Sequence, residues 1–340
     1  MMGSMDNRSI SCVMALSVSL CACEVVETTT AAAEQAGTNL QGTNLQGTNL
    51  QGTNLQGTNL QGFQLGAATL SGIGLANLRV EKGELIAERD GVTLRGTSLV
   101  GTELQAEARI PGAAETTLVA YRIADVAPES SAYDPTHTGS TNLYTLEQWV
   151  EDSESWQPAC APDADGRRVA IPIAATWDEK GNRIESTSLF TFGCTTGVIA
   201  KCYRWGYRPW LTGYGEDMAE MHQTCTRLAR ADYCGDGVPH TQNGTLVNVW
   251  DNLPAPGPIQ RHGGLLPPLG MIFEAGWGPE GAVCLSHARW LTLGGLLVNV
   301  CPGRLVPPGL GGIACNSVLD VLLLHPSVRM FNESYVNLDL

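Results

Sequence analysis

Basic residues are scarce in this chain, and no run of them occurs anywhere along its 340 residues. Lysine and arginine together number 20, against 34 aspartates and glutamates, and the formal net charge is −14. Proteins that bind nucleic acid or an anionic membrane through their charge need a basic surface that attracts phosphates. The composition therefore excludes nucleic acid as an expected partner, and it excludes membrane binding through a basic face.

Common catalytic and metal-binding motifs are also missing. The chain has no C-x-x-C pair, no H-E-x-x-H and no G-x-S-x-G. Zinc ribbons and zinc proteases depend on the first two spacings, and the common α/β hydrolases place their nucleophile in the third. We therefore expect no metal and no cofactor, and no serine stands out as a nucleophile.

Cysteine is absent from residues 37–105 and concentrated later in the chain. Of eleven cysteines, three lie in the first 23 residues. The other eight are Cys160, Cys194, Cys202, Cys225, Cys234, Cys284, Cys301 and Cys315. An even number confined to one region predicts four disulfides and an oxidising compartment, with metal binding as the alternative. Many pairings are possible, and a loop closed by Cys301 and Cys315 is one guess.

The first 36 residues have the pattern of an export signal followed by a tether. A short apolar run follows Arg8 and is too short to span a bilayer comfortably. It ends in "LCAC", which resembles a bacterial lipobox in which Cys23 receives the lipid. The resemblance implies a signal peptide at 1–22, a lipidated cysteine and tether at 23–36, and attachment to the bacterial outer membrane. An ordinary cleaved signal peptide with free secretion is the alternative.

Residues 37–61 are five copies of the pentad GTNLQ, which has no charged or aromatic residue. Five residues advance a helix by about 500°, so the leucines of a helix would form no stripe. In a strand, an odd period would place successive leucines on opposite faces. Each copy resembles the pentapeptide-repeat family, which implies a short right-handed four-sided β-helix in which every leucine points to the axis.

The period continues in degraded form and returns before Leu104, so the predicted repeat region is 37–105. The stretch 76–91 breaks the period and is expected to be a cap or a hairpin. For residues 37–61, a flexible uncharged stalk is the alternative, because glycine and asparagine are poor strand formers.

Residues 106–340 have the pattern of a disulfide-stapled α+β domain. The best helix is 215–234, where acidic residues stand at the start, Arg227 and Arg230 near the end, and apolar residues three and four apart. The other expected elements are strands at 117–126 and 244–253, a strand or short helix at 142–150, hairpins around Gly181 and around GPEG at 278–281, a helix opening 195–210, and a short helix in 317–326.

The stretch "RADYCGDGVPHT" at 230–241 follows "CTRLA" and "FTFGCTTGVIAKCYRWGYRPW" and precedes "FEAGWGPEGAVCLSHARW". Together these segments resemble the ADYC-domain proteins, which are mostly predicted exported proteins of myxobacteria. Ala231, Asp232, Tyr233 and Cys234 spell the name, and the likeness covers roughly residues 110–330. The resemblance implies an architecture rather than a particular activity.

Two sets of residues are candidates for a site. His240 with Asp232 or Asp236 could form a pair in which a carboxylate orients an imidazole as a general base. The cysteines offer no nucleophile to this pair, because disulfides would occupy them. The second set, in "YRWGYRPW", is either core or an aromatic and arginine recognition surface, and its members are Arg204, Trp205, Tyr207, Arg208 and Trp210.

The sequence thus predicts an exported, lipid-anchored envelope protein with a non-catalytic binding or structural role. Its expected partners are the membrane, through the lipid at Cys23, and an envelope protein, a peptide or a polysaccharide. The alternative is an extracytoplasmic hydrolase that uses His240 with Asp236 or Asp232.

Overall fold

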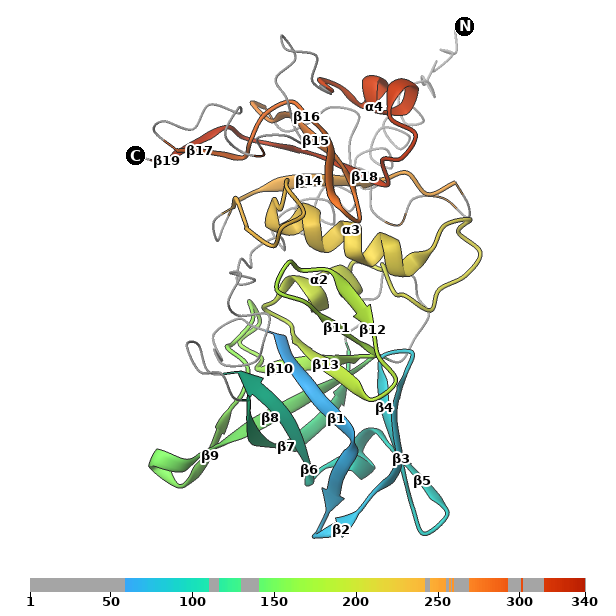
Figure 1. Cartoon of the computed structure of the whole chain (residues 1–340), viewed down its shortest axis with the longest axis vertical. Coiled ribbons are helices and arrows are strands. Elements are labelled where there is room, and N and C mark those ends of the chain that lie inside the picture. The colour runs from blue at the N-terminus through green and yellow to red at the C-terminus, as the bar shows by residue number, and fades with distance from the viewer. Residues whose placement is uncertain are drawn as a thin grey trace, which may run out of the picture.

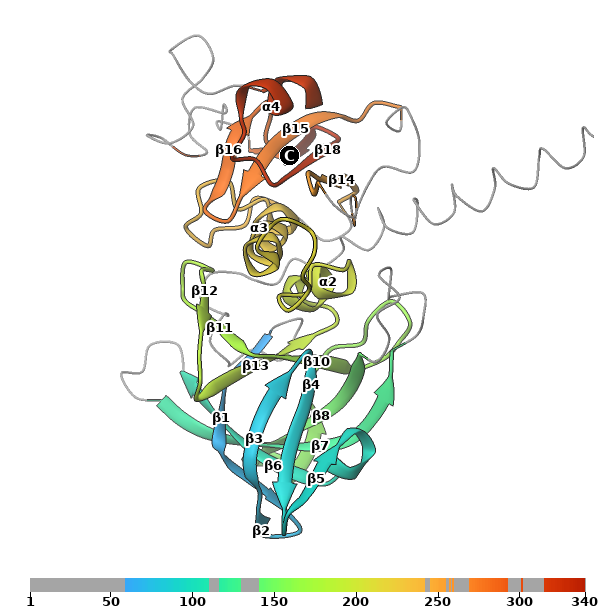
Figure 2. The ribbon, with the colours of Figure 1, turned by 90° about the vertical axis from the view of Figure 1, so that its right-hand side faces the viewer.

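The structure is a computed structural model that describes residues 59–109, 116–129, 141–241, 245–254, 257, 259, 269–292, 301 and 315–339. The predicted leader, Cys23, the tether and the repeat copies before residue 59 lie outside the described residues. Three layers are visible: a β-barrel at one end, two helices in the middle, and a second sheet at the other end (Figures 1 and 2).

The barrel is a closed ring of antiparallel strands. Its order is β10–β13–β1–β6–β7–β8, and β8 pairs again with β10 to close the ring. Two short strands, β2 (Ile73–Gly74) and β9 (Ser155–Pro158), extend this sheet from β1 and β8. The ring strands are β10 (Val169–Ile173), β13 (Leu189–Cys194), β1 (Asn59–Leu70), β6 (Thr102–Arg109), β7 (Thr116–Pro128) and β8 (Asn142–Val150).

Strand β1 is made from the end of the pentad repeat. Leu60 pairs with Phe192 and Phe63 with Phe190, so three residues on β1 advance against two on β13. This bulge turns both Leu60 and Phe63 into the barrel core, where they are at most 2% exposed. Gly62 makes the bulge possible, because its φ is +78° and a Cβ there would lie 2.9 Å from a backbone oxygen of Glu107.

The described part of the repeat region is therefore not a four-sided coil, and the structure corrects that expectation for residues 59–105. A five-residue period can fit a strand when a bulge shifts the alternation of side chains between the two faces. The prediction of a four-sided coil assumed a strand without bulges. Residues 76–91 form the expected hairpin. β3 (Ala76–Glu81), β4 (Glu84–Arg89) and β5 (Val92–Arg95) make a small sheet, and η1 (Gly96–Leu99) leads into β6. β6 itself crosses the boundary expected at residue 106.

Two helices form the middle layer, α2 (Val198–Arg204) and α3 (Met218–Arg230). Helix α3 begins where the charge pattern predicts, and the side chain of its N-cap, Asp217, accepts the N–H of Ala219. A disulfide between Cys202 and Cys225 joins the two helices. The hairpin of β11 (Ala175–Trp177) and β12 (Arg183–Glu185) turns at Gly181, as predicted. A short helix, η3 (Glu151–Ser153), connects β8 to β9.

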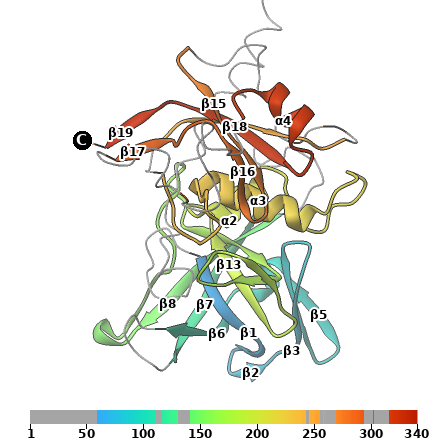
Figure 3. The ribbon, with the colours of Figure 1, turned by 45° about the horizontal axis from the view of Figure 1, so that its top comes forward.

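The second sheet has a helix on each face. Its order is β14 (Val247–Asp251), β18 (Met330–Ser334), β15 (Ile272–Gly278) and β16 (Gly281–Leu285). Trp277 and Met330 belong to the core shared with α3, whereas Phe273 and Phe331 pack with Val321 of α4 (Val318–Leu324). Helix α4 thus lies on the outer face, away from the barrel (Figure 3).

The expected α+β class is correct only in part, because the fold is mostly β with few helices. A parallel pair, β17 (Trp290–Thr292) and β19 (Asn337–Asp339), completes the strands of the described residues. The strands at 117–126 and 142–150 and the hairpin at 278–281 are present as β7, β8 and β15–β16. No helix in the described part of the chain is long and apolar enough to cross a membrane.

Candidate functional site

Helix α3 ends in a tight turn that carries the most distinctive motif of the chain. Ala231 adopts the left-handed conformation with φ of 52°, and its N–H donates to the carbonyls of Arg227 and Leu228. This arrangement closes the helix and reverses the chain. The three residues that follow, Asp232, Tyr233 and Cys234, then reach three different partners.

The carboxylate of Asp232 is fully buried and bonded at both oxygens. Its Oδ2 atom pairs with Arg227 and accepts the backbone N–H of Gly237 at 3.1 Å, while Oδ1 accepts the N–H of Asp236 at 3.2 Å. The Arg230 guanidinium lies 4.0 Å from the same Oδ2. Buried charges are unfavourable unless they are paired, so Asp232 serves as the counter-ion that allows two arginines to be buried.

Arg227 connects this turn to two others. Its guanidinium donates to the Lys180 carbonyl at 2.6 Å and to Asn182 Oδ1 at 2.5 Å, both in the β11–β12 turn. It also donates to the Pro279 carbonyl at 3.1 Å, in the β15–β16 turn. A Cβ at Gly181 would lie only 3.1 Å from Arg227 Nη1, so this approach favours glycine. Three turns that are distant in sequence therefore meet at one buried cation.

Tyr233 leads to a second buried ion pair, between Glu274 and Arg289. Arg289 donates to both oxygens of Glu274 at 3.0 Å each. The Tyr233 hydroxyl donates to Glu274 at 2.9 Å and accepts the Arg289 backbone N–H at 2.8 Å. Asn332 donates to the other Glu274 oxygen at 2.7 Å, and all four side chains are at most 1% exposed.

The charges of this pair are stabilised by their surroundings. Burial alone would raise the pKa of Glu274, but the charge and hydrogen bonds of Arg289 hold that pKa below its ordinary value. Burial would lower the pKa of Arg289, yet Glu274 raises it. Burial and the nearby Glu274 raise the pKa of Tyr233 well above 10.0. Each group keeps one protonation state near neutral pH, which is typical of a stabilising network.

His287 and Ser334 form a buried pair beside this network. His287 Nε2 lies 3.1 Å from Ser334 Oγ, and Nδ1 lies 2.9 Å from the carbonyl of Phe273. Burial lowers the pKa of His287, although Glu274 acts to raise it. The ring donates from Nδ1 to the carbonyl, and its Nε2 faces the serine hydroxyl, which also bonds to Glu274. Because Ser334 is fully buried, this pair links strands rather than facing a substrate.

The predicted catalytic residues do not form an acid–base pair. The ring of His240 is 5.6 Å from that of Tyr233, and burial lowers the pKa of His240 although the charges of Asp236 and Asp232 act to raise it. Asp236 is exposed and accepts the N–H of Val238 at 3.0 Å, as in an ordinary turn. Within the described ranges, the imidazole has no hydrogen bond to either carboxylate.

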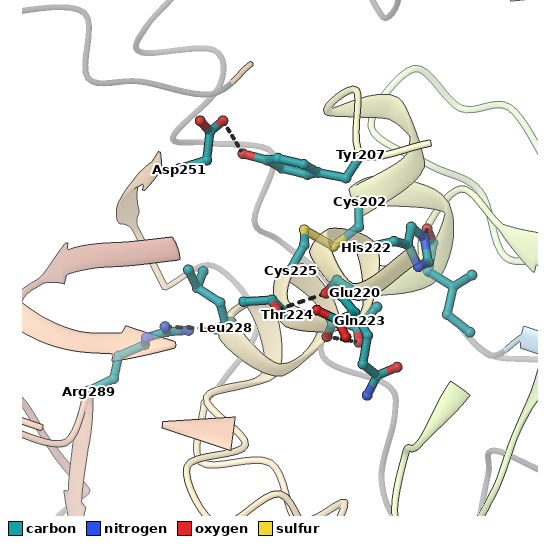
Figure 4. Close-up of a disulfide and its surroundings, with 12 residues drawn as sticks. Cys202, Tyr207, Glu220, His222, Gln223, Thr224, Cys225, Leu228, Asp251 and Arg289 are labelled. Atoms are coloured by element: carbon teal, nitrogen blue, oxygen red, sulfur yellow. Dashed lines mark hydrogen bonds between the residues drawn. A yellow bond between two sulfur atoms is a disulfide. The ribbon is translucent and has the colours of Figure 1, made fainter. Parts of the chain in front are cut away.

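The predicted recognition residues are mostly in the interior and do not form a surface patch. Tyr207 is fully buried and donates to Asp251 at 2.9 Å (Figure 4). Arg208 is 2% exposed and stacks over the ring of Tyr203 at 5.0 Å. Trp210 packs on the same tyrosine at 5.0 Å and is only partly buried. The structure therefore favours the core alternative for this segment.

The remaining two members of that segment are also engaged. Arg204 donates to Glu129 at 2.7 Å and lies 3.6 Å from Asp163, and all three side chains are almost completely buried. Trp205 is 8% exposed and belongs to the core between the helices and the second sheet. The alternation of arginine and aromatic residues here reflects buried pairing and stacking rather than an exposed binding surface.

Two perturbed groups lie close to the Cys202–Cys225 disulfide. His222 contacts the carbonyl of Ile199 at 3.0 Å, and burial lowers its pKa to about 3 (Figure 4). Burial, aided by the charge of Arg204, lowers the pKa of Lys201 to about 7, and its amine has no hydrogen-bond partner in the described part of the chain. Sequence reasoning missed Lys201, since a lysine at helical spacing ordinarily faces solvent.

The eight cysteines form four disulfides, as predicted. The pairs are Cys160–Cys194, Cys202–Cys225, Cys234–Cys301 and Cys284–Cys315. The guess that Cys301 closes a loop with Cys315 is wrong, because each of them reaches back to an earlier part of the domain. Cross-links of this kind indicate an oxidising, extracytoplasmic environment.

Partial reduction of the folded protein is expected to open Cys234–Cys301 before the other three disulfides. Cys234 is only partly buried, whereas the other seven cysteines are at most 4% exposed, and exchange requires access of a thiolate to sulfur. The measurement is alkylation of released thiols at a low concentration of a dithiol, followed by peptide mass analysis. Cys202–Cys225, buried at both ends, is the reference, and its opening first would contradict the prediction.

Comparison with protein-family models gives two matches. The model of the ADYC domain matches residues 96–291, which is more than half of the chain. The chain belongs to the ADYC-domain family. Every residue of the ADYC motif is thus explained by the turn after α3: a left-handed helix cap, a counter-ion, a buried hydroxyl and a disulfide. The implied myxobacterial origin stays a prediction.

The second match is to pentapeptide repeats, in eight copies over residues 36–72. Its last part coincides with β1, so the end of the repeat supplies one strand of the barrel, and the other ring strands lie within the ADYC match. Neither curated proteins nor solved structures gave a significant match.

Proposed function

We propose that this ADYC-domain protein is exported, is anchored in the cell envelope by a lipid on Cys23, and has a binding or structural role. The four disulfides support export, because such bonds form and persist outside the cytosol. The anchor is supported by the lipobox-like "LCAC" at residues 20–23. An envelope protein, a peptide or a polysaccharide is the proposed partner.

The non-catalytic part of the proposal depends on one observation. The polar groups of the family motif are bonded to other groups inside the protein: Asp232 to Arg227, and Tyr233 to Glu274. Catalytic groups need an open position toward a reacting atom. A hydrolase would require His240 to work with Asp236, since the carboxylate of Asp232 already neutralises buried arginines. The motif is therefore best interpreted as the device that holds three turns together.

Metabolic labelling with a palmitate analogue is expected to mark the wild-type chain and to miss Cys23→Ala. Lipidation requires a cysteine at the cleavage position, so removing that thiol removes the attachment point. Cys21→Ala is the matched control, because it changes a cysteine of the leader two positions away and should still be labelled. Equal labelling of Cys23→Ala and wild type would refute the lipid anchor.

Partner searches should use the whole chain, because a fragment from residue 106 would lack β1 and leave the barrel open.

A further inference from the structure

Helix α4 presents an apolar side to solvent. Leu319, Leu322 and Leu323 share one side of the helix and are 63%, 52% and 71% exposed, and Leu324 follows at 66%. Leu324 lies about 100° further round than Leu323, at the C-terminal end of the helix. We call the four residues together the α4 leucine face. Monomeric proteins rarely gather exposed leucines in this way, and such patches mark contact sites.

Helix α4, which carries the α4 leucine face, lies at the outer end of the molecule (Figures 1 and 3). Val321, on the opposite side of the helix, is 1% exposed and packs with Phe273 and Phe331 of the second sheet. The Cys284–Cys315 disulfide fixes the chain just before the helix. The leucines are therefore presented by a scaffold, and their exposure is not a consequence of a loosely attached segment.

Charge argues against an ionic partner for this face. The one charged residue of the helix is Asp320, whose carboxylate accepts the N–H of Asn316 at 2.9 Å. No lysine or arginine lies between residues 315 and 324, and Arg329 is paired with Glu216 at 2.8 Å. Attraction to this face must come from burial of leucine.

Size argues against a protein partner on this face alone. A helix of seven residues is only about 10 Å long. Stable protein interfaces bury about 800 Å² on each partner, more than four leucine side chains can supply. A lipid surface has no such requirement, since each leucine gains by entering the acyl region independently.

We infer that the α4 leucine face inserts into a lipid bilayer surface. This inference rests on the proposed envelope location and adds a second membrane contact to the lipid on Cys23. The contact on the folded domain would add buried apolar area to the attachment at Cys23 and would orient the second sheet toward the bilayer.

The test uses the full oxidised chain carrying Cys23→Ala, so that failure of the lipid anchor leaves it unaffected. Phosphatidylcholine vesicles are expected to slow amide hydrogen exchange in residues 318–324 at least tenfold, equally at low and high salt. Leu322→Ser with Leu323→Ser should abolish this protection. Leu118→Ser is the matched control, because Leu118 is 55% exposed on β7 of the barrel, and it should leave the protection intact.

Three results would overturn the inference. They are unchanged exchange in the presence of vesicles, protection that requires anionic lipid and disappears in salt, and protection without vesicles that grows with protein concentration. The last would assign the face to a second copy of the chain. Circular dichroism of each variant checks that the fold is retained, and a single Leu323→Ser change provides a milder version if the double variant unfolds.

Discussion

Replacing Arg289 with methionine is expected to lower the free energy of unfolding by about 3–5 kcal/mol at neutral pH. The change removes two hydrogen bonds and the positive charge that face Glu274, and it leaves that carboxylate fully buried. Chemical denaturation of the oxidised protein measures the effect. Arg95→Met is the control, because Arg95 is 56% exposed and 3.5 Å from Glu84, and a surface pair contributes about 0–1 kcal/mol.

The same variant should show a reversed dependence on pH. In the wild type, the pKa of Glu274 is held below its ordinary value, so the pair stabilises the fold above that value and the contribution is lost as pH falls. Without Arg289, burial raises the pKa of Glu274, and a proton taken up at acidic pH relieves the buried charge. The difference between variant and wild type should therefore shrink as pH falls from neutral toward the ordinary glutamate pKa of 4.5 and below. A constant difference would mean that lost packing, and not charge, explains the effect.

Replacing Asp232 with asparagine is expected to lower the free energy of unfolding by about 3–5 kcal/mol. Asparagine has nearly the same shape, but it leaves Arg227, which is 1% exposed, without the carboxylate that it pairs with, and it removes a negative charge 4.0 Å from Arg230. Asp236→Asn is the matched control, four residues away in the same turn. It should change stability by less than about 0.5 kcal/mol, because Asp236 is exposed and its turn bond can be retained.

The two variants also separate the structural interpretation of the motif from the catalytic one. If Asp232 is the counter-ion of the turn, urea denaturation will show a large loss for Asp232→Asn and almost none for Asp236→Asn. Comparable losses would indicate that the turn is not organised around Asp232. Unchanged stability of Asp232→Asn would contradict the structural interpretation altogether.

Local patterns were sufficient to predict the three α-helices of the described residues and several of the strands and hairpins. Helix α3 follows from apolar spacing, an acidic start and a basic end, all of which act within a few residues. The turn at Gly181 follows from a glycine between two strand-forming runs. Four disulfides follow from an even cysteine count in one region. The pairing of the cysteines could not be predicted in this way, because connectivity depends on which segments the fold brings together.

In the repeat region, the five-residue period was identified correctly, but the structure predicted from it was wrong for the described residues. A five-residue spacing excludes an uninterrupted strand, yet β1 contains a bulge at Gly62 and register shifts on both sides. Whether a bulge forms depends on what the partner strands offer, and β13 lies more than a hundred residues later. Sequence spacing within the repeat carries no information about that partner.

The contacts of the candidate site also depend on residues that are distant along the chain. Arginine and aromatic residues occur both in exposed recognition surfaces and in buried cores. The segment "YRWGYRPW" therefore could not predict that Tyr207 donates to Asp251, 44 residues away. Likewise, Glu274 and Arg289 lie 15 residues apart, and they meet because the β15–β16 hairpin brings the chain at Ser286 back beside Glu274.

The charge of the protein, its cysteine content, the positions of its main helix and hairpins, and the family motif after α3 could all be derived from the amino-acid sequence. These properties depend on residues that are neighbours along the chain. The folded structure was needed to show that the repeat ends as a barrel strand, that the motif is a buried junction, and that four leucines are exposed. Those outcomes depend on contacts between distant segments, where burial and pairing of charge outweigh local preference.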